Sequence, residues 1–294
     1  MTGGLLALAS AVLWGFSGVF VKETTPKFGA LHVGAIGMGV TAALAVVIAA
    51  GAGAITWNAP VTVFLAGLVV MAASLSMIGR IWFVQALAQG DVSLVFPVTN
   101  GLFILFTLTG SVLLFDEPVT WTIVAGGVLV LTGMALVSIG GGDQGDSGKF
   151  GSGSKRLSAF GLGAIAAFTL AMGVLGINRV VEDVDPLLVN AMRTPLMVAM
   201  VLGIAKVRRG RSTAAGATRR DIGKVWLSGL LGGGSSVTFV SALALSSPAT
   251  VVVLNSTSPV FAAMLAMAYL HEHITPRVAL GIALSVGGVA LTLL

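Results

Sequence analysis

The sequence contains no cysteine and only three histidines among its 294 residues. Without cysteine the chain can form no disulfide framework, thiol nucleophile or thiolate metal site. Two of the histidines, His271 and His273, lie in one short loop, and His32 lies far from both. We therefore expect no metalloenzyme, no metal site and no cofactor.

Charged residues are also scarce. They make up 9% of the chain, whereas an average soluble domain has about 25%. Hydrophobic residues make up 56%, and the mean hydropathy is +1.02. A soluble globule of this length would need a far larger polar surface, and an outer-membrane barrel would give only a weak hydropathy signal. The composition predicts an all-α polytopic membrane protein.

The formal net charge is +5. In a soluble protein such an excess can indicate nucleic-acid binding. Here the basic residues lie in loops between apolar runs, which is typical of topology signals. We therefore expect the partners to be the lipid bilayer and a small-molecule substrate, with no nucleic acid and with a monomeric chain.

Ten segments are long and apolar enough to span a membrane as helices. The stretch between the fifth and sixth is rich in Gly, Ser and Asp and reads as a flexible linker. This divides the chain into a first repeat (1–140), a linker (141–157) and a second repeat (158–294). The first span starts almost at Met1 without a basic leader or cleavage site, so we expect it to be retained. The spans are 4–21, 30–51, 60–87, 92–115, 119–139, 158–178, 186–206, 222–246, 248–270 and 275–294.

The two halves of the sequence resemble each other. FDEPVTWTIVAGGVLVLTGMAL (115–136) aligns with LHEHITPRVALGIALSVGGVAL (270–291) at an offset of 155. Further upstream, FVQALA (83–88) aligns with FVSALA (239–244) at an offset of 156. The matched pairs include Asn100 with Asn255, Glu117 with Glu272, Thr120 with Thr275, Gly126 with Gly281, and Gly133 with Gly288.

Each half holds five predicted spans, and five is odd, so the second half must enter the membrane in the opposite orientation. Inverted repeats of this kind are typical of secondary transporters, whose substrate site lies near the bilayer midplane between the halves. The pattern predicts a transporter and no enzyme. A duplicated membrane scaffold without transport activity is the alternative.

The loop charges predict an orientation. Thirteen of the sixteen Lys and Arg lie in the odd-numbered loops, and Arg179 alone lies in an even-numbered loop. The positive-inside rule places the odd loops in the cytoplasm and both termini outside the inner (plasma) membrane. The thirteen are Lys22, Lys27, Lys149, Lys155, Arg156, Lys206, Arg208, Arg209, Arg211, Arg219, Arg220, Lys224 and Arg277.

The paired E-x-x-T…G…G ends, the two five-helix halves and Trp14-Gly15 followed by Lys22 resemble the drug/metabolite transporter superfamily, and within it the EamA family. This resemblance implies a central cavity and alternating access without ATP hydrolysis, with amino acids or similar metabolites as exported substrates. Two features depart from the family. Family members often carry an Arg early in the second helix of each half. Arg193 occupies this position in the second half, but Gly37 occupies it in the first half. The termini of family members are usually cytoplasmic.

Ionisable residues inside spans are costly and are functional candidates by default. Arg80 lies in the third span, where it could bind a carboxylate in a cavity; a snorkelling or helix-linking role is the alternative. Arg193 lies in the seventh span, where a structural role in helix packing or interfacial anchoring is at least as plausible as a role in the substrate site.

Amides and prolines mark further candidates for the cavity. Asn100 and Asn255 are repeat-related and would face each other across the cavity. Alternatively, these amides serve only as hydrogen-bonding contacts between helices. Gln85 and Ser256 are similar candidates. Pro97 and Pro259 can free backbone carbonyls where helices line a cavity.

Aromatic and acidic residues complete the candidates. Trp14 and Phe239 could form walls or gates, or could simply pack between helices. Glu117 and Glu272 lie at helix junctions, where a capping role is favoured over proton coupling. No acidic residue lies in the middle of a span, which disfavours hydrophobic-cation efflux, the second transport hypothesis.

Overall fold

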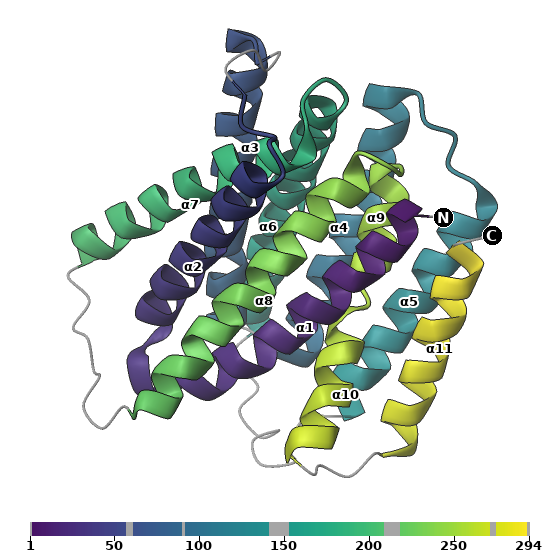
Figure 1. Cartoon of the computed structure of the whole chain (residues 1–294). Helices are drawn as coiled ribbons and strands as arrows, with labels where there is room; N and C mark the ends of the chain where they lie inside the picture. Colours follow the sequence, from purple (N-terminus) through teal and green to yellow (C-terminus); the bar gives the residue numbers. More distant parts are fainter. Residues whose placement is uncertain are drawn as a thin grey trace.

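The computed structural model describes residues 2–56, 61–89, 92–140, 153–208, 218–270 and 275–292, and these are helical almost throughout (Figure 1). Each expected span corresponds to a helix or, for the ninth, to two helices. The helices are α1 (Thr2–Phe28), α2 (Ala30–Gly51), α3 (Val63–Gln89), α4 (Val92–Phe115), α5 (Trp121–Gly140), α6 (Gly153–Val181), α7 (Pro186–Arg208), α8 (Arg219–Leu243), α9 (Pro248–Asn255), α10 (Ser258–Leu270) and α11 (Pro276–Thr292).

The boundaries differ from expectation mainly around the linker. Helix α6 begins at Gly153, inside the segment that the sequence suggested as linker and before the expected start at 158. The remainder of the expected linker lies outside the described residues. Six helices in the described part of the chain are long and apolar enough to cross a membrane, and three further apolar stretches are shorter.

The ninth span is discontinuous. Helix α9 begins with Pro248 behind the N-cap Ser247, whose hydroxyl accepts a hydrogen bond from the Thr250 N–H. It ends at Asn255, and α10 starts at Ser258. Pro259 occupies the first turn of α10, where its missing N–H costs nothing. The ninth span, expected as one helix over 248–270, is thus two helices separated by Ser256 and Thr257.

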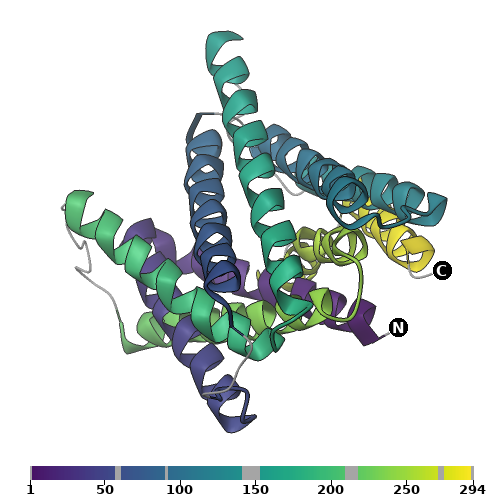
Figure 2. The ribbon, with the colours of Figure 1, turned by 90° about the horizontal axis from the view of Figure 1, so that it is seen from above.

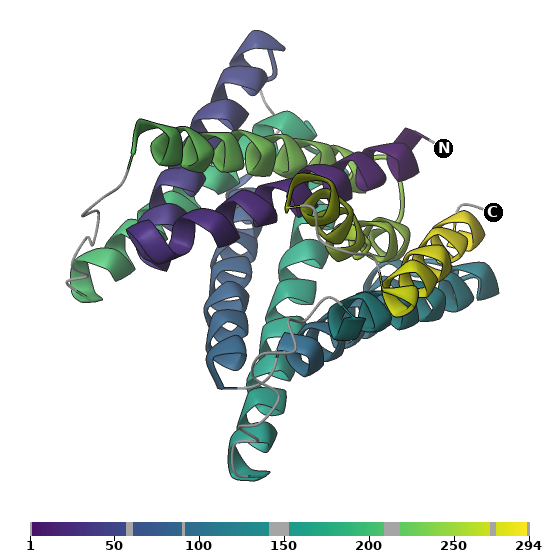
Figure 3. The same ribbon diagram turned by 90° about the horizontal axis from the view of Figure 1, so that it is seen from below.

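The packing obeys the twofold relation expected of an inverted repeat. Helix α1 packs along α8, and its repeat partner α6 packs along α3 (Figures 2 and 3). On one interface the Ser235 Oγ donates to the Ser10 O at 3.0 Å. The residues 156 positions away are Gly79 and Ala166, and a Cβ added at Gly79 would lie 3.1 Å from the Ala166 O.

A second pair of contacts follows the same relation. The Ser17 Oγ donates to the Ser228 O at 2.8 Å between α1 and α8. The equivalent positions are Gly173 on α6 and Ala72 on α3, where a Cβ added at Gly173 would lie 3.2 Å from the Ala72 O. Equivalent backbone positions therefore meet in both interfaces, with serine hydrogen bonds in one and close glycine packing in the other.

The repeat-matched glycines meet where α5 packs against α11. A Cβ added at Gly126 would lie 2.7 Å from the Gly288 O, and one at Gly288 would lie 2.6 Å from the Gly126 O. A Cβ at Gly133 would similarly meet the Gly281 O and lie 2.7 Å from the Ser285 N. Small residues let membrane helices approach this closely, which explains why these glycines recur at an offset of 155.

The topology places both chain ends on one side of the molecule (Figure 1). On the opposite side lie the C-terminal end of α1 and the N-terminal end of α8 (Figure 1). The observed fold is therefore an all-α membrane bundle of two inverted five-span repeats, as expected from the sequence.

Candidate functional site

Arg80 lies on α3 and contacts an aromatic ring of α1. Its guanidinium carbon lies 4.7 Å from the ring centroid of Trp14, within the range of a cation–π interaction. Arg80 is half-buried, and no hydrogen bond or ion pair of its side chain occurs within the part of the chain that the structure describes. The contact places the guanidinium against the ring of Trp14.

Arg193 lies on α7 and is held by two polar neighbours. Its Nη2 donates to the Ser236 Oγ of α8 at 2.8 Å and to the Asn190 Oδ1 at 3.2 Å. The Ser236 hydroxyl donates in turn to the same Asn190 oxygen at 2.8 Å. The Arg193 Nε and the Asn190 Nδ2 are buried without a hydrogen-bond partner among the described residues.

The two arginines belong to one site. A Cβ added at Gly232 would lie 4.0 Å from the Trp14 Cζ3, and Ser236 follows Gly232 by one turn of α8. Trp14 of α1 therefore lies between the helix that carries Arg80 and the stretch of α8 that binds Arg193. We call Trp14, Arg80, Asn190, Arg193 and Ser236 the arginine site.

Asn255 lies in a separate polar cluster at the break of the ninth span. The Ser10 Oγ of α1 lies 3.0 Å from the Asn255 Oδ1 and 3.0 Å from the Ser235 Oγ. Because Ser235 precedes Ser236 on α8, this cluster lies next to the arginine site along that helix. Ser256 is buried, and its hydroxyl donates to the Val252 O of its own helix at 2.8 Å, which closes the end of α9.

The other candidates from the sequence are distributed around these clusters. Phe239 is partly buried and packs against the main hydrophobic core. Gln85 and Asn100 are half-buried on α3 and α4. Glu272 and the side chain of Pro97 lie outside the described residues.

Glu117 lies in the short connection between α4 and α5. Burial raises the pKa of its carboxyl above the ordinary value, and the nearby Glu182 carboxylate adds to the increase. Its Oε2 is buried and has no hydrogen-bond partner in the described part of the chain. This environment stabilises the neutral acid form.

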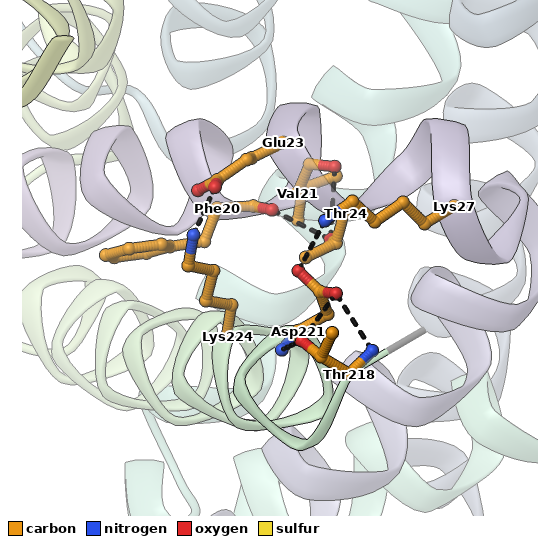
Figure 4. Close-up of polar contacts among 8 residues, drawn as sticks. All are labelled: Phe20, Val21, Glu23, Thr24, Lys27, Thr218, Asp221 and Lys224. Atoms are coloured by element: carbon orange, nitrogen blue, oxygen red, sulfur yellow. Dashed lines mark hydrogen bonds and ion pairs between the residues drawn. The ribbon is translucent and has the colours of Figure 1, made fainter. Parts of the chain in front are cut away.

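Two ion pairs join α1 to α8 at the end away from the chain termini (Figure 4). The Lys27 Nζ donates to the Asp221 Oδ1 at 2.7 Å, and Lys224 pairs with Glu23. Asp221 also forms a capping box with Thr218, so the same carboxylate starts α8 and binds α1. We call these four charged residues the α1–α8 ion pairs.

Sequence reasoning identified Trp14, Arg80 and Arg193 but missed Asn190 and Ser10. Asn190 precedes Arg193 by three residues, which places both on one helix face, and this spacing could have revealed it. Ser10 carries no such signal, because its partners Ser235 and Asn255 lie more than 200 residues away in sequence.

The arrangement offers polar groups suited to ligand binding. The described residues contain no group of three His, Asp or Glu side chains able to hold a metal ion. Two guanidinium groups, an amide and a hydroxyl form a polar site among apolar helices, which is how membrane proteins line a solute pathway.

Comparison with known proteins gives the same architecture. A crystal structure of a protein matches with a TM-score of 0.80 at 16% identity, covering 98% of this chain and 95% of the other. The chain is 27% identical over 139 residues to the uncharacterized transporter YvbV of Bacillus subtilis (strain 168). That match covers 46% of this chain and 44% of YvbV, so it spans less than half the length of that relative.

The model of the EamA-like transporter family matches the chain twice, over residues 1–139 and 157–294. The two matched segments cover nearly the whole chain and coincide with the two inverted repeats. This family implies a multi-pass membrane protein that acts as a transporter rather than as an enzyme. The chain belongs to the EamA-like transporter family.

Proposed function

We propose that the chain is a secondary transporter that moves small organic metabolites bearing a carboxylate, amino acids or similar compounds, by alternating access. The observation that carries the proposal is the arginine site. Two guanidinium groups lie inside the spans of a family transporter, and that of Arg80 has no hydrogen bond or ion pair among the described residues. Guanidinium groups bind carboxylates through charge-assisted hydrogen bonds that can be bidentate.

The asymmetry of the two repeats supports alternating access. Glu23, Lys27, Asp221 and Lys224 join α1 to α8 by ion pairs. At the equivalent interface of α6 with α3, the positions 156 residues away hold Arg179 on α6, Asp183 in the turn after α6, and leucines 65 and 68 on α3. Arg179 and Asp183 pair with each other at 2.8 Å. Among the described residues, ion pairs therefore join α1 to α8 but not α6 to α3, as expected if the halves rock about the site between them.

We propose that the odd loops face the cytoplasm of a plasma membrane and that both termini face outside, as the basic residues of the odd loops indicate. The α1–α8 ion pairs then close the cytoplasmic end. We propose export because the family that the sequence resembles includes exporters of amino acids and other metabolites. A reporter enzyme that is active only in the cytoplasm, fused to the C-terminus, should be inactive; an active fusion would contradict this orientation.

The experiment that tests transport is solute flux into liposomes containing the purified protein. We expect saturable uptake of a carboxylate-bearing solute that depends on Arg80. The alternative of hydrophobic-cation efflux predicts flux of a lipophilic cation instead, which the two positive charges disfavour. Absence of flux for every ligand that binds would favour the non-transporting scaffold.

A further inference from the structure

We propose that the arginine site selects organic acids with two negative charges over zwitterions and monoanions of the same size. This inference rests on the proposed transport function and narrows its substrate class. It is carried by the charge balance of the spans and by the hydrogen-bonding groups that remain unpaired in the site.

No acidic residue lies in the middle of a predicted span, where it could balance the arginines. The nearest acidic residues along the chain are Asp185, eight residues before Arg193, and Asp91, eleven residues after Arg80. The four ion pairs among the described residues all involve other basic residues. The site therefore holds two positive charges in an apolar bundle, where unpaired charge is costly.

The unpaired groups in the site are donors. The Arg193 Nε and the Asn190 Nδ2 are buried and lack an acceptor within the described residues. Asn190 is 0% exposed, and its oxygen already accepts from Arg193 and Ser236. A ligand that fits must therefore bring acceptor oxygens, which an ionised carboxylate supplies without bringing a donor.

One carboxylate satisfies only half of this arrangement. It balances one of the two guanidinium groups, and the second stays uncompensated. A zwitterion also brings an ammonium group, which needs an anionic or carbonyl acceptor where the site offers donors. A second carboxylate removes the remaining charge, so binding energy is largest for a dianion.

The site offers two guanidinium groups, one for each carboxylate of a dianion. Arg80 lies against Trp14 through its ring contact, and Arg193 is held by Ser236 and Asn190. Because the arginines come from α3 of the first repeat and α7 of the second, a dianion would bridge the two halves. Substrate binding then couples directly to the relative position of the repeats.

The test compares three four-carbon acids on the purified full-length protein: succinate, butyrate and 4-aminobutyrate. These are a dianion, a monoanion and a zwitterion of equal chain length. Ligand binding to the native state raises its apparent stability, so thermal unfolding at increasing ligand concentration gives each affinity. We expect succinate to bind about tenfold or more tightly than either of the others.

Two variants assign the effect to the site. Arg80→Gln and Arg193→Gln should each reduce the preference for succinate over butyrate to near unity, because each removes one of the two charges. Lys206→Gln, which removes an exposed charge at the end of α7, should leave the preference unchanged. Equal affinity for the three acids, or a preference for 4-aminobutyrate, in the wild-type protein would overturn the inference. Flux of amino acids without such a preference would overturn it and still leave the proposed transport function standing.

Discussion

The contact between α5 and α11 gives a quantitative test of the inverted-repeat packing. Gly288 and Gly287 are adjacent on α11 but face different surroundings. A Cβ at Gly288 would lie 2.6 Å from the Gly126 O and 2.8 Å from the Val130 N, whereas a Cβ at Gly287 would meet nothing within 4 Å. The pair Gly288→Ala and Gly287→Ala therefore adds the same methyl group at a helix contact and at a free surface.

The magnitudes follow from the geometry. Carbon–oxygen contacts settle at about 3.3 Å or more, so Gly288→Ala forces the two helices apart by roughly 0.5–1 Å. Overpacking of this kind costs about 1–3 kcal/mol. An alanine in a helix interior gains about 0.5–1 kcal/mol over glycine. Gly288→Ala should thus be net destabilising, and Gly287→Ala neutral or stabilising, with a difference of about 1–3 kcal/mol between the two variants.

The assay is denaturant unfolding of the purified protein in detergent micelles, with stability obtained from the midpoint and slope. The reasoning is refuted if Gly288→Ala is as stable as Gly287→Ala. In that case α5 and α11 would not meet through their repeat-matched glycines.

Three further outcomes are expected. Arg80→Ala should fold but lose about 10- to 100-fold in affinity for a carboxylate solute, measured by ligand-dependent thermal shift, as expected for a lost charge-assisted hydrogen bond; unchanged affinity would remove Arg80 from the site. Lys27→Ala should speed the labelling of Ser17→Cys by a thiol reagent, because it frees α1 from Asp221, and the chain has no native cysteine to interfere; unaltered labelling would show that the ion pair does not hold this end closed. Burial raises the pKa of Glu117 above its ordinary 4.5. The contribution of Glu117 to the stability of the folded protein is therefore complete below pH 4.5 and is lost as pH rises through the raised pKa. Thermal melts of Glu117→Gln should lack this loss of stability, and a pH profile identical to that of the wild-type protein would contradict the assignment.

The fold could be predicted from the sequence because each of its signals is local or periodic. Apolar runs mark the spans, and the offset of 155 to 156 residues gives the inverted repeat without any knowledge of contacts. The break of the ninth span was not predicted, although its Ser-Pro step carries a signal, since an X-Pro step disfavours helix for the preceding residue. The start of α6 was placed too late, because glycine and serine at 153 and 154 read as linker.

The site could be predicted only in part. Arg80 and Arg193 stand out because a charged side chain inside a span is costly and is a functional candidate by default. Asn190 and Ser10 do not, since a small polar residue in a span is common and its role depends on which helix faces it. The α1–α8 ion pairs were missed for the same reason. Glu23 and Lys224 lie 201 residues apart, and their loop positions read as topology signals until α1 and α8 are placed side by side.

The central claim is that this chain moves a carboxylate-bearing solute through the arginine site. The most direct measurement is counterflow of labelled succinate into liposomes that contain the wild-type protein and are preloaded with unlabelled succinate. The account predicts saturable, transient accumulation of label that is lost in Arg80→Gln and retained in Lys206→Gln. Accumulation that is equal in wild type and Arg80→Gln, or its absence for succinate, butyrate and 4-aminobutyrate alike, would contradict it.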